Sequence, residues 1–274
     1  MPESPEPILE VRGVQKFFDG HQVLNDITLM VAPGETVVIL GPSGCGKSTL
    51  LRVIIGEYAP DAGHVYMWGE DVCCAGTERL DKLRQRFGIL FQSGALYSSM
   101  TVGENVALPL REHTDLDAKI VEMVVKMKLE LVGLRDFENL MPSQISGGMR
   151  KRVGLARAIA RDPQILFYDE PTAGLDPIAT SVIDQLIIDL RTKLGVTSIV
   201  VTHDMKSALR IGDRIAMLYN GEFIAIGTPD DFRNPTDERV RQFVEGLPDG
   251  PIPLRVSKTD YVSDLFGIRK EDLA

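Results

Sequence analysis

Short runs of apolar and β-branched residues dominate the first third of the chain, and glycine, proline or aspartate separates them. Four of these runs predict β-strands, at residues 8–12, 23–31, 36–40 and 65–68. The first third is therefore expected to be mostly β-structure.

The middle third has a helical pattern instead. Apolar residues recur every three or four positions over residues 117–132, which predicts an amphipathic helix. The apolar positions are Ile120, Met123, Val124, Met127 and Leu131. We interpret this methionine-bearing stripe as ordinary core packing, the usual role of an apolar helix face.

Strands and helices alternate in the last third. Residues 165–168 and 197–201 are apolar runs that predict strands, and Pro177 begins a helical pattern between them. The apolar face of that helix holds Ile183, Leu186, Ile187 and Leu190. A strand–helix–strand order implies parallel strands joined by a crossover helix. Asn220 and Gly221 then predict the turn of a β-hairpin, with strands at residues 215–219 and 222–226.

The composition changes at residues 246–253, which hold three prolines and two glycines. No internal repeat or low-complexity tract stands out before them. We therefore interpret residues 246–274 as an extension of one main domain.

Composition places the chain among ordinary globular proteins. Its 274 residues are 44% hydrophobic and 25% charged, and no run reaches the roughly 18 apolar residues of a membrane-spanning helix. The first ten residues are acidic and proline-rich, so we expect no secretory signal and a cytoplasmic location. The net charge of −9 argues against nucleic acid as a partner. Cys45, Cys73 and Cys74 lack a CxxC spacing, so we expect neither a disulfide framework nor a zinc site.

The strongest chemical signal is the segment GPSGCGKS, which fits the phosphate-binding pattern GxxxxGK(S/T). It follows a predicted strand and precedes an apolar helix, and its glycines allow successive amides to face phosphate oxygens. Lys47 is expected to reach the β- and γ-phosphates of a nucleotide, and Ser48 to bind Mg²⁺. A glycine-rich turn without a ligand is the weaker interpretation. The residues assigned to this phosphate loop are Gly41, Pro42, Ser43, Gly44, Cys45, Gly46, Lys47, Ser48 and the adjoining Thr49.

Two carboxylates, Asp169 and Glu170, follow the predicted strand at residues 165–168. Ligands of open α/β sheets bind at the carboxyl ends of the strands. Asp169 is therefore suited to hold the metal ion, and Glu170 to act as general base on the attacking water. Alone, such a pair is more often an ordinary strand end, but the phosphate loop in the same chain favours the catalytic interpretation.

Three further segments carry weaker signals. Ser146 is a good N-cap, so the simplest interpretation of this segment is the start of a helix. Two glycines in the first turn, Gly147 and Gly148, destabilise a helix, however, and are better explained if their backbone amides must approach an anion closely. His203 follows the strand at residues 197–201, at the same sheet edge as the two carboxylates, and Gln92 follows a short apolar run. Taken singly, such a His or Gln is usually a satisfied polar residue.

In their order along the chain, these segments resemble the nucleotide-binding domain of the ATP-binding cassette (ABC) family. The resemblance spans about residues 8–245. Met149 stands where the family signature has glutamine, and Phe18 where a tyrosine is commoner, although a phenylalanine ring can still stack on adenine. The matching positions are Phe18, the phosphate loop, Gln92, Ser146, Gly147, Gly148, Met149, Asp169, Glu170, Ala173 to Asp176, and His203.

The resemblance implies a fold, a reaction and a dimer. The fold is α/β: a P-loop NTPase core of the RecA type with an N-terminal antiparallel β-subdomain and an α-helical signature subdomain at about residues 94–160. ATP and Mg²⁺ are the implied cofactors. The implied catalytic residues are Glu170, His203 and Gln92, and the implied metal-binding residues are Ser48, Gln92 and Asp169. Two copies are expected to face each other head to tail. Ser146, Gly147 and Gly148 would then contact the γ-phosphate of ATP held by the other copy, and the resemblance also implies nucleotide binding by Met149 and Asp176.

Residues 91–114 and 240–255 also resemble the ATPases of the Mla (MCE-type) phospholipid transport systems of double-membraned bacteria. This resemblance implies a motor subunit at the cytoplasmic face of the inner membrane that supports outer-membrane lipid asymmetry. Its implied partners are an integral membrane permease, which the segment around Gln92 contacts, a lipid-binding MCE subunit and a small STAS-domain protein. The extension at residues 246–274 is implied to reach the neighbouring ATPase. Residue chemistry alone does not identify the cargo.

Other classes share part of the pattern. Soluble ABC ATPases of translation or DNA repair have the same motifs, but usually carry two cassettes or a long coiled-coil insertion. A metabolite kinase with a phosphate loop lacks the signature and the Glu170 base, and a nucleotide switch is disfavoured by Glu170 with His203. The alternatives that stay open are an ABC transporter for another cargo and a soluble ABC ATPase that transports nothing.

Overall fold

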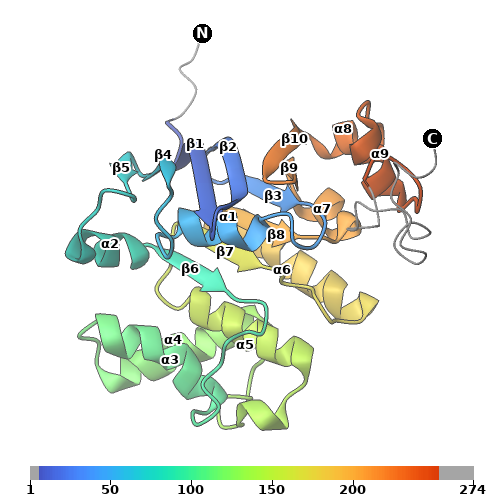
Figure 1. Ribbon diagram of the computed structural model, residues 1–274. Coiled ribbons are helices and arrows are strands. Elements are labelled where there is room, and N and C mark those ends of the chain that lie inside the picture. Colours follow the sequence, from blue (N-terminus) through green and yellow to red (C-terminus); the bar gives the residue numbers. More distant parts are fainter. Residues whose placement is uncertain (1–5, 253–274) are drawn as a thin grey trace, which may run out of the picture.

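Two β-sheets with helices packed on them, and a separate group of helices, make up residues 6–252, the part of the chain that the computed structural model describes (Figure 1). The larger sheet has six strands in the order β10-β9-β3-β8-β7-β6, and only β10 runs antiparallel to its neighbour. Its strands are β3 (Thr36–Leu40), β6 (Phe87–Leu90), β7 (Ile165–Asp169), β8 (Thr197–Thr202), β9 (Arg214–Tyr219) and β10 (Glu222–Gly227). The predicted parallel pairing of the last third and the hairpin at Asn220 are confirmed.

The smaller sheet is antiparallel, in the order β2-β1-β4-β5. It comprises β1 (Leu9–Phe18), β2 (His21–Val31), β4 (Ala62–Met67) and β5 (Glu70–Asp71). Strand β1 extends six residues beyond the predicted end at Arg12, because it pairs with β2 as far as Phe18 opposite His21. Its second half alternates less clearly between apolar and polar residues, so the sequence pattern shows only the first half.

Alternation along β3 divides the interior into two cores. Val37 and Ile39 face a core shared with the antiparallel sheet and α1 (Lys47–Ile54), and Val38 and Leu40 face the core on the other side. That second core is shared with α6 (Pro177–Leu194) and α7 (Met205–Ile211), which confirms the predicted apolar face of α6. A strand buried on both faces of a parallel sheet is apolar at nearly every position, as β3 is.

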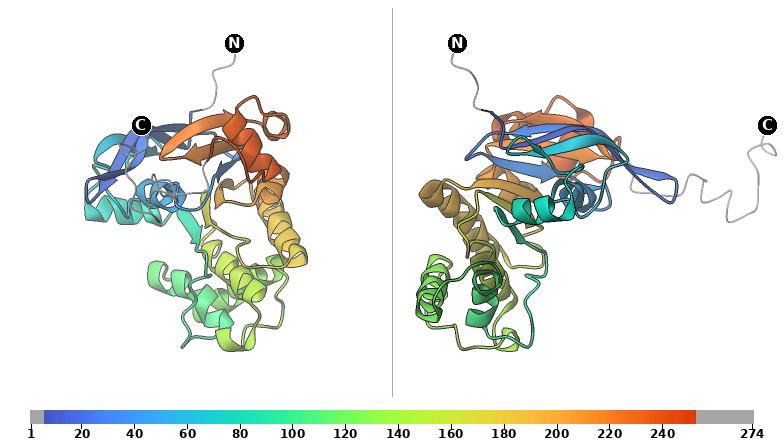
Figure 2. Two further views of the ribbon diagram at one scale, coloured as in Figure 1. Left: turned by 45° about the vertical axis from the view of Figure 1, so that its right-hand side comes forward. Right: turned by 90° about the vertical axis from the view of Figure 1, so that its left-hand side faces the viewer.

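Three helices form the group to one side of both sheets, coloured green in Figures 1 and 2. They are α3 (Val102–His113), α4 (Ala118–Leu131) and α5 (Gly147–Ala158), with a 3-10 turn at Pro142–Gln144 before α5. Thr101 and Glu104 form a capping box that begins α3, and the buried Asn105 amide donates to the carbonyls of Tyr97, Met100 and Thr101. These bonds hold the loop that joins the helices to the sheet edge.

The methionine stripe of α4 is not a core face, and that prediction is wrong. Met123 and Met127 are 62% and 60% exposed, and Ile120 and Leu131 are exposed as well. The buried face instead holds Val121, Val125, Lys128 and Leu129. Both faces of α4 carry apolar residues at helical spacing, so periodicity predicts the helix but not which face packs against α3 and α5.

The remaining helices lie at the edges of the sheets. They are α2 (Thr77–Arg84), α8 (Pro229–Arg233) and α9 (Glu238–Glu245). Across residues 6–252, no helix has both the length and the apolar character that crossing a membrane requires. The Gln242 side chain of α9 exchanges hydrogen bonds with the backbone of Ile252, and the rest of the extension, residues 253–274, lies outside the described residues.

Candidate functional site

The phosphate loop joins the end of β3 to the start of α1, and the fold itself requires two of its glycines. A Cβ on Gly41 would lie 2.2 Å from the carbonyl oxygen of Leu218, and one on Gly46 would lie 2.9 Å from that of Val23. Gly46 also has φ 106°, a region that residues with a side chain rarely adopt. The loop can pass this close to β2 and β9 only because both positions lack a side chain.

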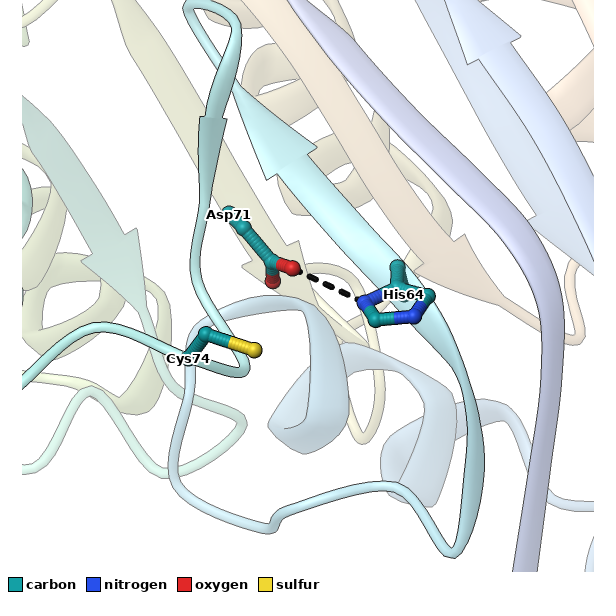
Figure 3. Close-up of side chains that lie close together, drawn as sticks. All are labelled: His64, Asp71 and Cys74. Carbon is teal, nitrogen blue, oxygen red and sulfur yellow. Dashed lines mark hydrogen bonds and ion pairs between the residues drawn. The ribbon is translucent and has the colours of Figure 1, made fainter.

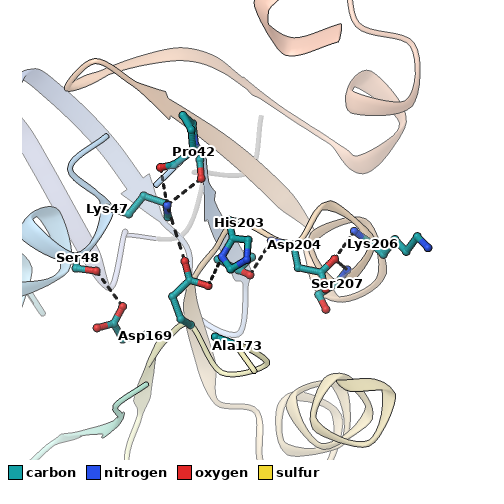
Figure 4. Close-up of polar contacts among 12 residues, drawn as sticks. Pro42, Lys47, Ser48, Asp169, Ala173, His203, Asp204, Lys206 and Ser207 are labelled. Atoms are coloured by element: carbon teal, nitrogen blue, oxygen red, sulfur yellow. Dashed lines mark hydrogen bonds and ion pairs between the residues drawn. The ribbon is translucent and has the colours of Figure 1, made fainter. Parts of the chain in front are cut away.

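Lys47 is buried and folds back across this loop. Its Nζ donates to the carbonyl oxygens of Gly41 and Pro42, at 2.8 and 2.9 Å, and lies 3.8 Å from Oε1 of Glu170 (Figure 4). The ammonium group is therefore held between the loop and the carboxylate predicted to be the base. This is the position from which it can meet the terminal phosphates of a nucleotide.

Ser48 and Asp169 come from different elements and meet beside the loop. The Ser48 hydroxyl donates to Oδ1 of Asp169 at 3.2 Å. Burial raises the pKa of Asp169, while the bond from Ser48 opposes this. A hydroxyl and a carboxylate oxygen are ligands that suit Mg²⁺, so the pair fits the predicted metal site. Gln92 does not join them: its side chain is exposed after β6 and makes no hydrogen bond to the pair within residues 6–252.

Glu170 lies between Lys47 and His203, as predicted from the shared sheet edge. Its Oε2 is 2.8 Å from Nδ1 of His203, which begins the loop after β8. The Glu170 side chain is only 12% exposed, and its backbone has φ 49°, the left-handed region. A glutamate strained in this way is held by its surroundings, a condition common in active sites. The arrangement can accept a proton from a water at the loop.

The signature segment begins α5 and has a different character. Ser146 caps the helix by accepting from the amide of Met149 at 3.2 Å. A Cβ on Gly147 or Gly148 would meet nothing closer than 3.7 or 3.6 Å, so the fold does not require glycine at either position. No residue from Ser146 to Met149 hydrogen-bonds to the phosphate loop in the described part of the chain. The glycines therefore fit an approach by a group from outside this chain.

Asp176 and Phe18 lie at the start of α6 and at the tip of the β1–β2 hairpin. Asp176 lines a shallow pocket with the signature residues and caps α6, accepting from the amides of Ala179 and Ile178, which lower its pKa. Phe18 is 39% exposed at the tip of the β1–β2 hairpin and packs edge-on against Tyr58, with ring centroids 5.5 Å apart. Tyr58 was not predicted to belong to the site, since it follows α1 with no motif to mark it.

Lys151 is another residue near this site that the motifs missed. It lies on α5, is buried, and donates to the carbonyl oxygens of Glu170 and Ala173 at 3.1 and 2.7 Å. Burial lowers its pKa, and the Glu170 carboxylate opposes that shift. In the sequence it is one of three consecutive basic residues, a pattern typical of an exposed helix face.

Known proteins resemble this chain over most of its length. The sequence pattern of the family described as ABC transporter matches residues 24–173. The intermembrane phospholipid transport system ATP-binding protein MlaF of Escherichia coli (strain K12) is 44% identical over 266 residues, covering 97% of this chain and 99% of the relative. The probable ribonucleotide transport ATP-binding protein mkl of Mycobacterium leprae is 40% identical over 252 residues, covering 92% and 73%.

Two solved structures share the fold. The ATP-binding cassette MJ0796, in a dimeric post-hydrolysis state bound to ADP and Pi, superposes with a TM-score of 0.75 at 33% identity, covering 81% of this chain and 98% of that one. CbiO1 of Clostridium perfringens, part of the ABC transporter complex cbiONQ, has a TM-score of 0.78 at 29% identity and covers 89% and 96%.

Proposed function

The chain belongs to the ABC transporter family of ATP-binding proteins, and we propose that it is the motor subunit that powers phospholipid movement between the inner and outer membranes. The near-full-length similarity to MlaF supports the cargo. The ribonucleotide-transport relative is slightly less similar, and the match covers only 73% of its length.

The observation that carries hydrolysis, as opposed to nucleotide binding alone, is the position of Glu170. In this proposal its carboxylate accepts the proton of the attacking water, and the 2.8 Å contact with His203 orients it. Lys47 binds the terminal phosphates from the other side. Mg²⁺, held by Ser48 and Asp169, would neutralise phosphate charge.

A second copy of the chain completes the site in this proposal. The signature glycines have room for a Cβ within their own chain, so their amides are available to the γ-phosphate of ATP on a partner. The relative MJ0796 is dimeric in its nucleotide-bound structure. The signature segment and Asp176 of each copy would then face the phosphate loop of the other.

We propose that the membrane permease binds in an open cleft of about 720 Å³ between β6, α3 and α5. Phe91 and Tyr97, 41% and 54% exposed, line it beside Gln92, and Pro109, Arg157 and Arg161 complete its walls. An apolar helix of the permease would insert here, and a movement of the loop that contains Gln92 would then move that helix.

The remaining assignments follow from the same family. We propose that the chain works at the cytoplasmic face of the inner membrane, with an MCE lipid-binding subunit and a small STAS-domain protein in the complex. Residues 8–245 form the cassette, and residues 246–274 reach the neighbouring ATPase. Gln92 would act as a catalytic and Mg²⁺-binding residue, which requires its exposed loop to move toward Ser48 and Asp169.

Co-purification of the tagged full chain from detergent-solubilised membranes tests the transporter assignment. An integral membrane permease should co-purify, and Phe91→Glu with Tyr97→Glu should release it. The control Met123→Glu adds the same charge on the exposed face of α4 and should retain the permease. Recovery of the wild-type chain without any membrane protein would indicate a soluble ABC ATPase instead.

The cargo is tested with the purified complex in vesicles that carry a fluorescent phospholipid. Transfer of the phospholipid should require ATP and should stop with Glu170→Gln. If ATP turnover responds to a water-soluble solute and not to phospholipid, the cargo assignment is wrong while the motor assignment stands.

A further inference from the structure

Three metal-ligating side chains converge on the antiparallel sheet, away from the phosphate loop. His64 lies on β4, Asp71 ends β5, and Cys74 follows in the segment before α2. Nδ1 of His64 is 2.8 Å from Oδ2 of Asp71, and the ligand atoms of all three lie within 4.8 Å of one another (Figure 3). Pairing of β4 with β5 brings the three side chains together.

The local backbone orients this cluster. The second oxygen of Asp71, Oδ1, accepts from the amide of Cys73 at 2.8 Å, which turns the carboxylate toward His64. The sulfur of Cys73 points elsewhere and accepts from the amide of Val65 at 3.3 Å. Adjacent cysteines therefore have different surroundings, and only Cys74 belongs to the cluster.

We propose that His64, Asp71 and Cys74 bind one Zn²⁺ ion or a similar divalent transition metal. Imidazole, thiolate and carboxylate together suit Zn²⁺, which takes three protein ligands with an open fourth position, whereas Mg²⁺ and Ca²⁺ prefer oxygen alone. Bonds of roughly 2.0–2.3 Å need ligand atoms about 3.3–3.7 Å apart. His64 and Asp71, which are 2.8 Å apart, would therefore move apart by about half an ångström, and the more distant ligand atoms would close by about an ångström at most. His64 and Cys74 are exposed and free to do so. The bound ion would fasten the segment before α2 to β4.

Titration of the full chain with Zn²⁺ in a calorimeter tests this site. One equivalent should bind, and Cys74→Ser should weaken binding by at least about tenfold, with a similar loss for His64→Gln. Cys73→Ser removes the neighbouring thiol and should leave the affinity unchanged. Co²⁺ should give a thiolate charge-transfer band that Cys74→Ser removes. Absence of stoichiometric binding overturns the proposal, as does binding that survives Cys74→Ser, which would place the ion elsewhere, such as at Asp169.

A separate observation concerns Lys151, and it rests on the proposed function. Its Nζ donates to the carbonyl oxygens of both Glu170 and Ala173, and the amide of Ala173 donates to the same Glu170 carbonyl at 3.2 Å. The turn after β7 is thereby held closed from one side. The left-handed backbone of Glu170 costs roughly 1–3 kcal/mol and persists only while such contacts hold it.

We infer that Lys151 is a positioning residue that ties Glu170 to the signature helix. It lies two residues after Met149 on α5, so the same helix carries the signature at its start and the support of the base in its second turn. A shift of α5 on contact with a partner's nucleotide would move the Glu170 backbone with it. Each chain could thus adjust its own base to the occupancy of the opposite site.

The kinetics of Lys151→Met measure this role, since methionine keeps most of the length and loses the charge. We expect kcat for ATP to fall by about 100-fold, the effect of misplacing a catalytic group by an ångström, with KM nearly unchanged. Lys151→Arg should restore most of the loss. Lys128→Met is the matched control, because Lys128 is about equally buried but pairs with Asp162, in the segment between α5 and β7, and not with the turn of Glu170.

Equal losses of kcat in Lys128→Met and Lys151→Met, or a change in KM alone, would overturn this proposal and show that Lys151 only contributes to packing. Failure of the proposed function looks different. In that case the wild-type chain hydrolyses ATP no faster than Glu170→Gln, whatever the Lys151 variants do.

Discussion

The phosphate loop and the signature segment of this chain differ in how far contacts within the chain determine their structure. At the loop, Lys47, Glu170 and His203 form a continuous series of contacts no longer than 3.8 Å, and the fold requires Gly41 and Gly46 sterically. At the start of α5, Ser146 and Gly147 are exposed, and the fold has room for side chains in place of the glycines. Contacts within the chain hold the phosphate loop in place, whereas the signature segment is open to a group from outside the chain.

The largest expected effect comes from removing the cation of the phosphate loop. Lys47→Ala should weaken ATP binding by at least about 100-fold, since hydrogen bonds to a charged group contribute roughly 1.5–3 kcal/mol each. A fluorescent ATP analogue measures the Kd. Lys206→Ala removes an exposed lysine near the site and should bind normally. Unaltered affinity of Lys47→Ala would contradict the phosphate contact.

The second largest effect is expected when the general base is removed and ATP binding is kept. Glu170→Gln should lower kcat by about 10²–10⁴-fold, the usual contribution of a general base, while the Kd for ATP stays within about twofold. The closed dimer should then persist on a sizing column with ATP. Glu57→Gln, at an exposed glutamate after α1, is the control. Turnover near that of the wild type would remove Glu170 from the mechanism.

Gly148→Asp probes the signature segment. The fold has room for a Cβ at this position, and the new carboxylate would repel the partner's γ-phosphate, so ATP binding should persist while turnover falls by about 100-fold. An equal mixture with Lys47→Ala should recover about a quarter of wild-type activity, because half of the dimers are mixed and each has one intact composite site. If each site is formed within one chain, mixing recovers nothing.

The smallest expected effect lies outside both segments, at the buried Asp184 of α6. It accepts from the Ser207 hydroxyl at 3.1 Å, its other oxygen has no partner among the described residues, and burial raises its pKa. A carboxyl whose pKa is raised on folding destabilises the folded state when ionised. Asp184→Asn should therefore raise the Tm at neutral pH by about 2–4 °C, the shift that roughly 1 kcal/mol produces in a chain of this size.

The sign of this effect follows from linkage. The gain should be full above the raised pKa of Asp184 and should vanish as the pH falls below the ordinary pKa of aspartate. Melting curves at several pH values measure it, and kcat should stay unchanged because Asp184 does not touch the site. A gain that persisted at low pH would show that charge burial is not its cause.

The sequence alone predicted most of the site because its signals are local. The phosphate loop, Asp169 with Glu170, and His203 each follow an apolar strand, and parallel strands end at one edge whatever the rest of the chain does. The structure brings these residues together as predicted. Gln92 is the exception within the described residues, since it lies in an exposed loop with no contact to the metal-binding pair.

The amino-acid sequence therefore determined many of the strands and helices, the chemistry of the loop and the family, since periodicity and motif spacing depend on neighbouring residues. Tertiary structure decided which face of α4 is buried, that Lys151 supports Glu170, and that Cys74 joins His64 and Asp71. Each of these depends on contacts between distant segments, whose packing no local pattern records. The same holds for the contrast between the two segments, because only the neighbours of Gly41 and Gly148 show which glycine the fold itself requires.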